Sequence, residues 1–401
     1  MMEEARIADN KCMRWFCYVV MFELFLMGSG QELHVTSFLT LRMVNFMVAV
    51  AISLYCFVRT DDFPKTILWF IGSFTVLLLL SYFIAVAIDS FPEYIMEDIK
   101  PLIYFYILLF YYYVSSSEKV VEKAFSLLLL SAKIMTVLYL IYMVLTDLTG
   151  IIDYVIAYQT LQTDSILFRG VGSSFFYKGF VFLPIAAVGF FRNKQYIWLI
   201  LVCIAIYFTY TRGLYLLLVF GLAVYYLRTR HVSIVNIVAF ALVLLCIYEF
   251  FGVTELFYID KSFQDNREES DITRVLIIEQ VLDAITYWSF FIGHGFGYGI
   301  AERSTHMEIS YMDIFHKQGI IGVAFWLSLM VAVIYYARTV SNKYKETADF
   351  WVTATLMIYL QSCFNPYINT PMGMTVVFLA LVFCYRFSQD ERFADSSPVQ
   401  C

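Results

Sequence analysis

Residues 66–88 read TILWFIGSFTVLLLLSYFIAVAI, an apolar run that contains no charged side chain. A helix of about 20 apolar residues is long enough to cross the hydrocarbon core of a bilayer. Runs of this kind recur along the chain, and they do not alternate between apolar and polar residues, which excludes a transmembrane β-barrel. The chain is therefore predicted to be an all-α, polytopic integral membrane protein with about twelve transmembrane helices.

The composition supports this fold class. Of the 401 residues, 61% are hydrophobic and 15% are charged. Soluble domains are usually about half apolar and about a quarter charged, and a soluble fold could not bury this much apolar surface. The polar N-terminus is not followed by a short apolar core with a small-residue cleavage site, so the first apolar run is predicted to be a retained span.

The spans divide the chain into two helical parts that form one membrane domain. Residues 1–251 are predicted to hold nine spans and an outer loop at 147–174, residues 252–318 form a large outer loop, and residues 319–401 hold three spans, the third ending near 387, and a tail. The span 101–115 is short, and the division at Thr211–Gly213 is left open. The expected spans are 14–30, 37–58, 66–88, 101–115, 120–146, 175–191, 195–211, 213–228, 233–251, 319–338, 349–364 and 370–387.

The positions of Lys and Arg predict the orientation. If the N-terminus is cytoplasmic, every inner segment carries at least two of the 27 basic residues, whereas several outer segments carry none. Positive residues concentrate on the cytoplasmic side of membrane proteins. Both termini are therefore expected to be cytoplasmic. In the large outer loop, Thr273–Thr286 (TRVLIIEQVLDAIT) has apolar residues at helical spacing, with Asp271 as a candidate N-cap, which predicts a short helix on or near the membrane surface.

Three arginines lie at the outer ends of predicted helices: Arg169 in FRGVGSSFF, Arg212 in YTRGLYLLL and Arg274 in SDITRVLII. Arginine is permanently charged, and its fork of N–H donors fits phosphate. Singly, each could reach the interface or pair with a carboxylate. On one face, the three together would suit an anionic group such as a pyrophosphate. Arg303 and Tyr298 are further candidate substrate-binding residues in the outer loop.

His306, in STHMEISYMDIFHKQGIIG, is the best candidate for a general base. Imidazole titrates near the operating pH, as a base requires. An ordinary loop histidine is the alternative interpretation. His294 and His316 are weaker candidates, and nearby carboxylates could act instead, namely Glu302, Glu308 and Asp313.

Other polar features of the chain have simpler interpretations. The stretch Gly293–Gly299 (GHGFGYG) follows no strand, so a flexible tight turn is a better interpretation than a phosphate-binding loop, although its backbone could still approach a substrate. Glu23, Arg42 and Lys133 fall within spans, where they could form a polar path or pair with one another.

Four local patterns occur along the chain in this order: Arg169–Gly170 with Pro184 downstream, Thr211–Leu218 (TRGLYLLL), Arg274 followed by Gly293-His294-Gly295, and His306 followed by Gly319 and Gly322. Together they resemble the O-antigen ligase and polymerase superfamily of bacterial envelope glycan assembly. They cover residues 165–340. A family feature is missing, because Met307 follows His306 where the family often has Asn. This departure weakens the assignment of His306 more than that of the arginines, and it argues mildly against a ligase.

The resemblance implies a GT-C-like glycosyltransferase of the bacterial inner membrane, most like an O-antigen polymerase, that works on the periplasmic side without a metal or other cofactor. Its donor would be an oligosaccharide linked to undecaprenyl pyrophosphate, and its other partners would be membrane lipids and a chain-length regulator protein, with no role for nucleic acid. Arg169, Arg212 and Arg274 would hold the pyrophosphate, and His306 would act on the acceptor hydroxyl, so that His306, Arg274 and Arg212 are the expected catalytic residues.

Two other functions stay open at this point. A ligase of the same superfamily would transfer the glycan to the lipid A core instead of to another repeat unit. A transporter or flippase of a lipid-linked or anionic substrate belongs to another class. Transporters usually bind substrate near the midplane, between internal repeats. Here the basic candidates lie at the outer helix ends and no repeat is detected, which favours an enzyme.

Overall fold

The computed structural model describes residues 11–30, 33–36, 39–59, 64–114, 118–163, 165–169, 172–229 and 261–389, with side chains from 272 onward in the last range. This part of the chain is mainly helical, and the chain is an all-α polytopic membrane protein. The longest apolar helices within the described residues are long enough to cross a bilayer. They are α3 (Leu41–Arg59), α4 (Lys65–Ala87), α7 with its terminal π-turn (Glu118–Leu148), α15 (Ser310–Thr339) and α17 (Pro371–Ser388).

Shorter helices coincide with most of the other expected spans. The expected span 233–251 lies outside the described residues. The division that was left open at Thr211–Gly213 is confirmed, since α10 and α11 are separate helices that flank a turn at Thr209–Thr211. These shorter helices are α2 (Lys11–Met27), α9 (Phe182–Arg192), α10 (Tyr196–Phe208), α11 (Arg212–Thr229) and α16 (Lys345–Gln361), which follows a 3-10 turn at Asn342–Tyr344.

The expected helix at 175–191 is wrong at its start. Phe175–Tyr177 forms strand β4, which pairs antiparallel with β3 (Ile166–Phe168), and α9 begins only at Phe182 after a 3-10 turn at Lys178–Val181. Three successive aromatic residues suit a strand better than a helix. The second small sheet pairs β1 (His34–Thr36) with β2 (Leu39–Thr40).

The short span at 101–115 begins earlier than expected. Helix α5 (Pro92–Ile103) leads through a 3-10 turn at Tyr104–Tyr106 into α6 (Ile107–Val114). Pro101 lies inside α5, where its missing N–H weakens the regular helical hydrogen bonding and favours the tighter turn that follows. The amphipathic α5 thereby leads into the apolar helix α6 of the bundle.

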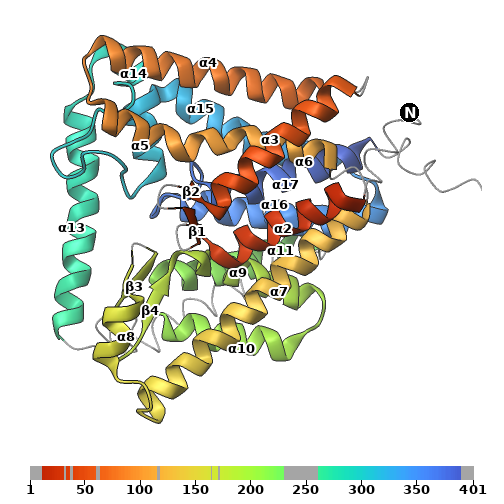
Figure 1. Cartoon of the computed structure of the whole chain (residues 1–401), viewed down its shortest axis with the longest axis vertical. Helices are drawn as coiled ribbons and strands as arrows, with labels where there is room; N and C mark the ends of the chain where they lie inside the picture. Colours follow the sequence, from red (N-terminus) through yellow and green to blue (C-terminus); the bar gives the residue numbers. More distant parts are fainter. Residues whose placement is uncertain are drawn as a thin grey trace, which may run out of the picture.

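The helix expected at Thr273–Thr286 is present but longer and displaced. Helix α13 is Lys261–Asp283, so Asp271 lies within it and is not its N-cap. No Gly or Pro interrupts this stretch, which allows the helix to start early. Figure 1 shows α13 running crosswise over one end of the bundle, from the side of α14 (Tyr287–Ile292) towards α8 (Tyr154–Leu161). We call this end the α13 end and the other the opposite end.

The helices α15, α16 and α17 pack against one another in the middle of the bundle. On one side α4 packs on α15 and α6, and the Phe74 ring stacks on Phe105 at a centroid distance of 4.0 Å. On the other side α9 packs on α7, α10 and α11. Helix α15 starts at Ser310, before the expected residue 319, and Gly319 interrupts it with a φ of 65°. The segment before this break carries part of the candidate site.

Candidate active site

A buried charged cluster joins α5 to the first segment of α15. The Lys317 Nζ lies 2.7 Å from the Asp98 Oδ1 and 2.6 Å from the Asp313 Oδ1. All three side chains are less exposed than 10%. Buried charges persist where they are paired and hydrogen-bonded. When all three groups are ionised, two carboxylates face one ammonium, so the cluster keeps one negative charge. We call these three residues the Asp98 cluster.

Hydrogen bonds fix both carboxylates of the Asp98 cluster. The Gly297 N–H donates to the Asp98 Oδ2 at 2.8 Å. The Asn369 Nδ2 donates to the Asp313 Oδ2 at 3.0 Å, and the Ser310 hydroxyl donates to the Asn369 Oδ1 at 3.3 Å. The cluster therefore holds α5, α15 and the segment before α17 in one arrangement.

His306 lies at the surface of this cluster. Its Nδ1 is 3.5 Å from the Asp98 Oδ1, and the imidazole is 45% exposed. The backbone on both sides of the histidine is also held, because the Lys317 Nζ donates to the Thr305 carbonyl at 2.8 Å and the Met307 N–H donates to the Asp313 Oδ1 at 3.3 Å. The candidate base thus has one ring nitrogen towards a carboxylate and a fixed backbone.

Met307 has a packing role that accounts for its presence after His306. Its side chain is 1% exposed and packs with Ile277 and Val281 of α13. An apolar residue at this position secures the crosswise helix, which an amide side chain would not do as well. The departure from the family pattern is thereby explained by the docking of α13.

The docking of α13 brings Arg274 next to the histidine loop. The Arg274 Nε lies 3.3 Å from the Glu308 Oε2, and the Arg303 Nη2 donates to the Glu308 Oε1 at 3.1 Å. Two guanidinium groups therefore share one carboxylate, two residues after His306. The loop that carries His306 thus also carries the carboxylate that binds Arg274 and Arg303, and one site made of these residues stays a prediction.

Arg169 and Arg212 lie together on the other side of the α13 end. The Arg169 Nη2 donates to the Thr211 hydroxyl at 3.1 Å, and the guanidinium lies 5.2 Å from the Phe176 ring centroid. Thr211 immediately precedes Arg212, which is exposed and begins α11. A helix N-terminus carries partial positive charge, so this position favours an anion.

The segment 362–370, between α16 and α17, connects the two sides. The Tyr367 N–H donates to the Ser310 hydroxyl at 3.1 Å, on the side of the Asp98 cluster. The Tyr367 hydroxyl donates to the Lys178 carbonyl at 3.2 Å, next to the β3–β4 hairpin. Burial raises the pKa of Tyr367, and the charge of Arg169 acts against this rise, so Arg169 lies within electrostatic range of the same tyrosine.

The Gly-rich stretch forms a tight turn, as the simpler interpretation predicted. The turn is packed inside the protein, however, and is not flexible. Its N–H groups are used inside the protein: His294 donates to the His316 carbonyl, Gly295 to the Lys317 carbonyl and Gly297 to Asp98. A Cβ on Gly295 would lie 2.6 Å from the Ala85 nitrogen. The approach of this backbone to a substrate, which the sequence had left open, is therefore not favoured.

The weaker histidine candidates form a ring stack behind this turn. Tyr298 stacks on His294 at 4.8 Å between centroids, and His294 lies 4.7 Å from the His316 ring. The His294 Nε2 is 3.1 Å from the Ala284 carbonyl, and His316 is buried. Tyr298 is half exposed and directly follows Gly297, which keeps it available as a platform for a sugar ring.

A second buried ion pair lies at the α13 end. The Arg42 Nη2 is 2.8 Å from the Glu23 Oε1, and the Arg42 Nη1 donates to the Gly28 carbonyl at 2.6 Å. Pairing was one of the two interpretations of these residues, and it is confirmed. Lys133 is elsewhere, with its Nζ 5.0 Å from the Trp198 ring centroid.

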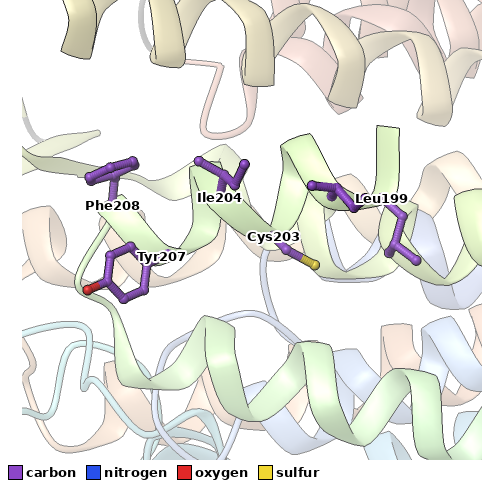
Figure 2. A pocket seen from close by; sticks show the side chains of 6 residues that line it. Leu199, Cys203, Ile204, Tyr207 and Phe208 are labelled. Carbon is purple, nitrogen blue, oxygen red and sulfur yellow. The ribbon is translucent and has the colours of Figure 1, made fainter. Parts of the chain in front are cut away.

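An apolar hollow of about 590 Å³ lies along α10 (Figure 2). Its described lining has no charged side chain, so it offers nothing to hold a phosphate, and the candidate site lies elsewhere. Within the described residues, His, Cys, Asp and Glu do not gather in threes as metal ligands would, and independence from metal stays a prediction. The lining residues are Leu199, Ile200, Cys203, Ile204, Tyr207 and Phe208.

Sequence reasoning missed Asp98 and Lys317. A signal for Asp98 was available, because it falls on the buried stripe of α5 that Ile95, Ile99 and Leu102 form. A charged residue on an apolar helical stripe needs a buried partner. The spacing of Asp313 and Lys317, four residues apart on one helix, was the matching signal on α15.

Comparison with known proteins gives one extended similarity. The chain is 22% identical over 383 residues to an O-antigen polymerase of Shigella flexneri, and the match covers 94% of this chain and 96% of that protein. No family model matches the chain. The similarity along nearly the full length of both proteins confirms the resemblance that the arginine and histidine patterns indicated.

Proposed function

We propose that this chain polymerises lipid-linked oligosaccharide repeat units of a bacterial surface polysaccharide, the O-antigen. The donor glycan passes from undecaprenyl pyrophosphate to a sugar hydroxyl of another repeat unit. The observation that carries the proposal is the similarity to an O-antigen polymerase over almost the whole of both chains. The two groups of arginines and the histidine at one end of the bundle supply the chemistry that such a transfer requires.

In this proposal the α13 end faces the periplasm of the inner membrane and both termini are cytoplasmic. The opposite end supports this orientation, because the basic residues Arg192, Arg228 and Lys343 lie there at the ends of helices or between them. Positive residues concentrate on the cytoplasmic side. A chain-length regulator protein and membrane lipids are the proposed partners.

The arginines of the α13 end hold the pyrophosphate leaving group. As the bond between the anomeric carbon and the phosphate oxygen breaks, the electron pair leaves with the pyrophosphate, and guanidinium groups stabilise that charge. Arg169 and Arg212 approach from the α11 side, and Arg274 and Arg303 from the α13 side. Glu308 forms ion pairs with the last two.

His306 is the proposed base. It accepts the proton of the acceptor hydroxyl while that oxygen forms the new bond to the anomeric carbon. The other candidates are already engaged, since Glu308 is shared by two arginines and Asp313 binds Lys317 inside the protein. Glu302 is exposed, and its side chain takes no part in these ion pairs.

Deletion of the gene in its native host tests the proposal, with a gel of the surface polysaccharide as the readout. The expected result is a lipid A core that bears one repeat unit, with the ladder of longer chains absent and restored by the wild-type gene. Core without any repeat, together with accumulated lipid-linked polymer, would indicate a ligase. An unchanged ladder would reject both activities for that glycan.

A further inference from the structure

We propose that Asp98 is the positioning residue of His306. In this arrangement the Asp98 carboxylate accepts the Nδ1–H of the imidazole, which leaves Nε2 as the nitrogen that receives the acceptor proton. The inference rests on the proposed function and deepens it, since it names the group that orients the base. It also assigns a role to a buried aspartate on a helix distant in sequence from the histidine.

The geometry around Asp98 suits this role. Its Oδ1 lies 3.5 Å from the His306 Nδ1, which is within ion-pair distance and at the long limit for a hydrogen bond. The carboxylate is 2% exposed and cannot rotate away, because the Gly297 N–H binds its Oδ2 and Lys317 binds its Oδ1. Within the described residues, the Nε2 of the exposed imidazole makes no hydrogen bond.

The backbone of His306 is held by the other members of the Asp98 cluster. Lys317 binds the carbonyl of the preceding residue, and Asp313 accepts the N–H of the following one. The remaining freedom of the histidine is therefore rotation of its side chain. Asp98 is the group placed to fix this rotation and to select the tautomer that carries its proton on Nδ1.

The charge of the cluster supports a role beyond the pairing of Lys317. Asp313 by itself would neutralise the lysine, and a second buried carboxylate adds a desolvation cost unless another cation uses it. The imidazolium that forms when His306 takes the acceptor proton is that cation. In the transfer, the hydroxyl proton moves to Nε2, the oxygen bonds to the anomeric carbon, the pyrophosphate leaves with the electron pair, and Asp98 stays ionised throughout.

A double-mutant cycle tests the assignment. Full-length protein in vesicles is given the lipid-linked repeat unit, and kcat is measured for wild type, Asp98→Asn, His306→Ala and the double variant. The expected loss for Asp98→Asn is roughly 10- to 100-fold, part of what a positioned base contributes. In the His306→Ala background the same change should alter kcat by less than about twofold, because Asp98 acts through the histidine. Equal losses in both backgrounds, or no loss in wild type, would overturn the proposal.

Glu23→Gln is the matched control for this cycle. It also neutralises a buried carboxylate paired with a cation at the α13 end, but its partner is Arg42 and it does not contact His306. It should leave kcat for each folded molecule unchanged both with and without His306. If Asp98→Asn does not accumulate in the membrane, Asp98→Glu keeps the charge that Lys317 requires while it shifts the carboxylate, and the cycle is run with that variant.

A second measurement does not depend on activity. The chain has five histidines, and ¹⁵N labelling of these residues, with His306→Ala to assign the signal, reports which ring nitrogen carries the proton. The expected tautomer of neutral His306 is Nδ1–H in the wild type, with a shift towards Nε2–H in Asp98→Asn. An Nε2–H tautomer in the wild type would reject the orientation even if polymerisation is observed. Wild-type protein that forms no polymer while His306 shows the Nδ1–H tautomer would reject the proposed function and leave the Asp98–His306 contact standing.

Discussion

Two buried ion clusters lie at the α13 end, and they differ in charge balance. Glu23 and Arg42 form a pair in which one carboxylate meets one guanidinium, and the Gly28 carbonyl takes a further N–H. The Asp98 cluster has two carboxylates for one lysine and opens onto a half-exposed histidine. We expect the balanced pair to serve packing, whereas we propose that the cluster with an uncompensated carboxylate acts on the neighbouring histidine. Under this proposal, the first cluster is a structural use of buried charge and the second is a chemical one.

Replacement of Lys317 by Met should have the largest effect. It leaves Asp98 and Asp313 facing each other inside the protein and releases the Thr305 carbonyl. Removal of one partner from a buried ion pair costs about 3–5 kcal/mol. We expect a strongly lowered unfolding temperature in detergent and no polymer. A Lys317→Met protein with wild-type stability would mean that the two carboxylates share a proton, which would remove the contrast between the clusters.

Arg274→Ala should have the second-largest effect. It should lower polymer formation while the amount of protein in the membrane stays normal. Loss of one donor to a developing oxyanion typically costs about 10²–10³-fold in turnover. The measurement is polymer length and rate in vesicles, and Arg228→Ala at the opposite end is the comparison. Arg228 is paired with Asp349 at 2.6 Å, so its loss should affect stability more than turnover. Wild-type chain lengths in Arg274→Ala would contradict the pyrophosphate role, and Arg212→Ala provides an independent repeat of the test.

Glu23→Gln should lower the stability of the protein without lowering its activity, which tests the difference between the two clusters. The change leaves the Arg42 guanidinium without its carboxylate in a buried site, at a cost of about 3 kcal/mol. We expect a lower unfolding temperature and an unchanged kcat for each folded molecule. A fall in kcat as large as that of Asp98→Asn would show that the balanced pair also serves the reaction.

Glu308→Gln should have the smallest effect, and its sign is informative. Glu308 binds Arg274 and Arg303 in a partly exposed site, where an ion pair is worth about 0.2–1 kcal/mol. If the pyrophosphate displaces this carboxylate, its removal should lower KM by about two- to fivefold and leave kcat unchanged. A rise in KM would mean that Glu308 holds the arginines in position instead of competing with the substrate.

Local sequence was informative about part of the candidate site. The position of Arg212 at the start of α11 follows from where the apolar run begins, because a charged residue is costly inside the hydrocarbon. The same prediction was wrong for Arg169, which follows strand β3, and for Arg274, which lies within α13 because that helix already starts at Lys261. His306 was singled out as a base by its residue type and surroundings in the chain. Asp98 and Lys317, which hold it, were not, since Asp98 is on a different helix and Lys317 was not among the candidate residues.

Errors in the predicted elements also have physical causes. The strand at Phe175–Tyr177 was assigned to a helix because three aromatic residues are apolar in any pattern, and only pairing with Ile166–Phe168 distinguishes the strand. The start of α13 was placed too late because the polar stretch before Thr273 has no apolar periodicity. Hydropathy identifies segments that are buried in the bilayer or in the protein interior, and it is a weaker guide to polar helices outside the membrane.

By itself, the sequence determined that the chain is mainly helical and that it is a membrane protein. These properties depend on the composition of about 20 residues at a time, and a bilayer leaves few alternatives for an apolar segment of that length. Only the tertiary structure decided that Asp98, Asp313 and Lys317 meet beneath His306, and that α13 brings Arg274 to Glu308. Such contacts join residues far apart in the chain, and their energies depend on burial and geometry that arise only when the helices pack together.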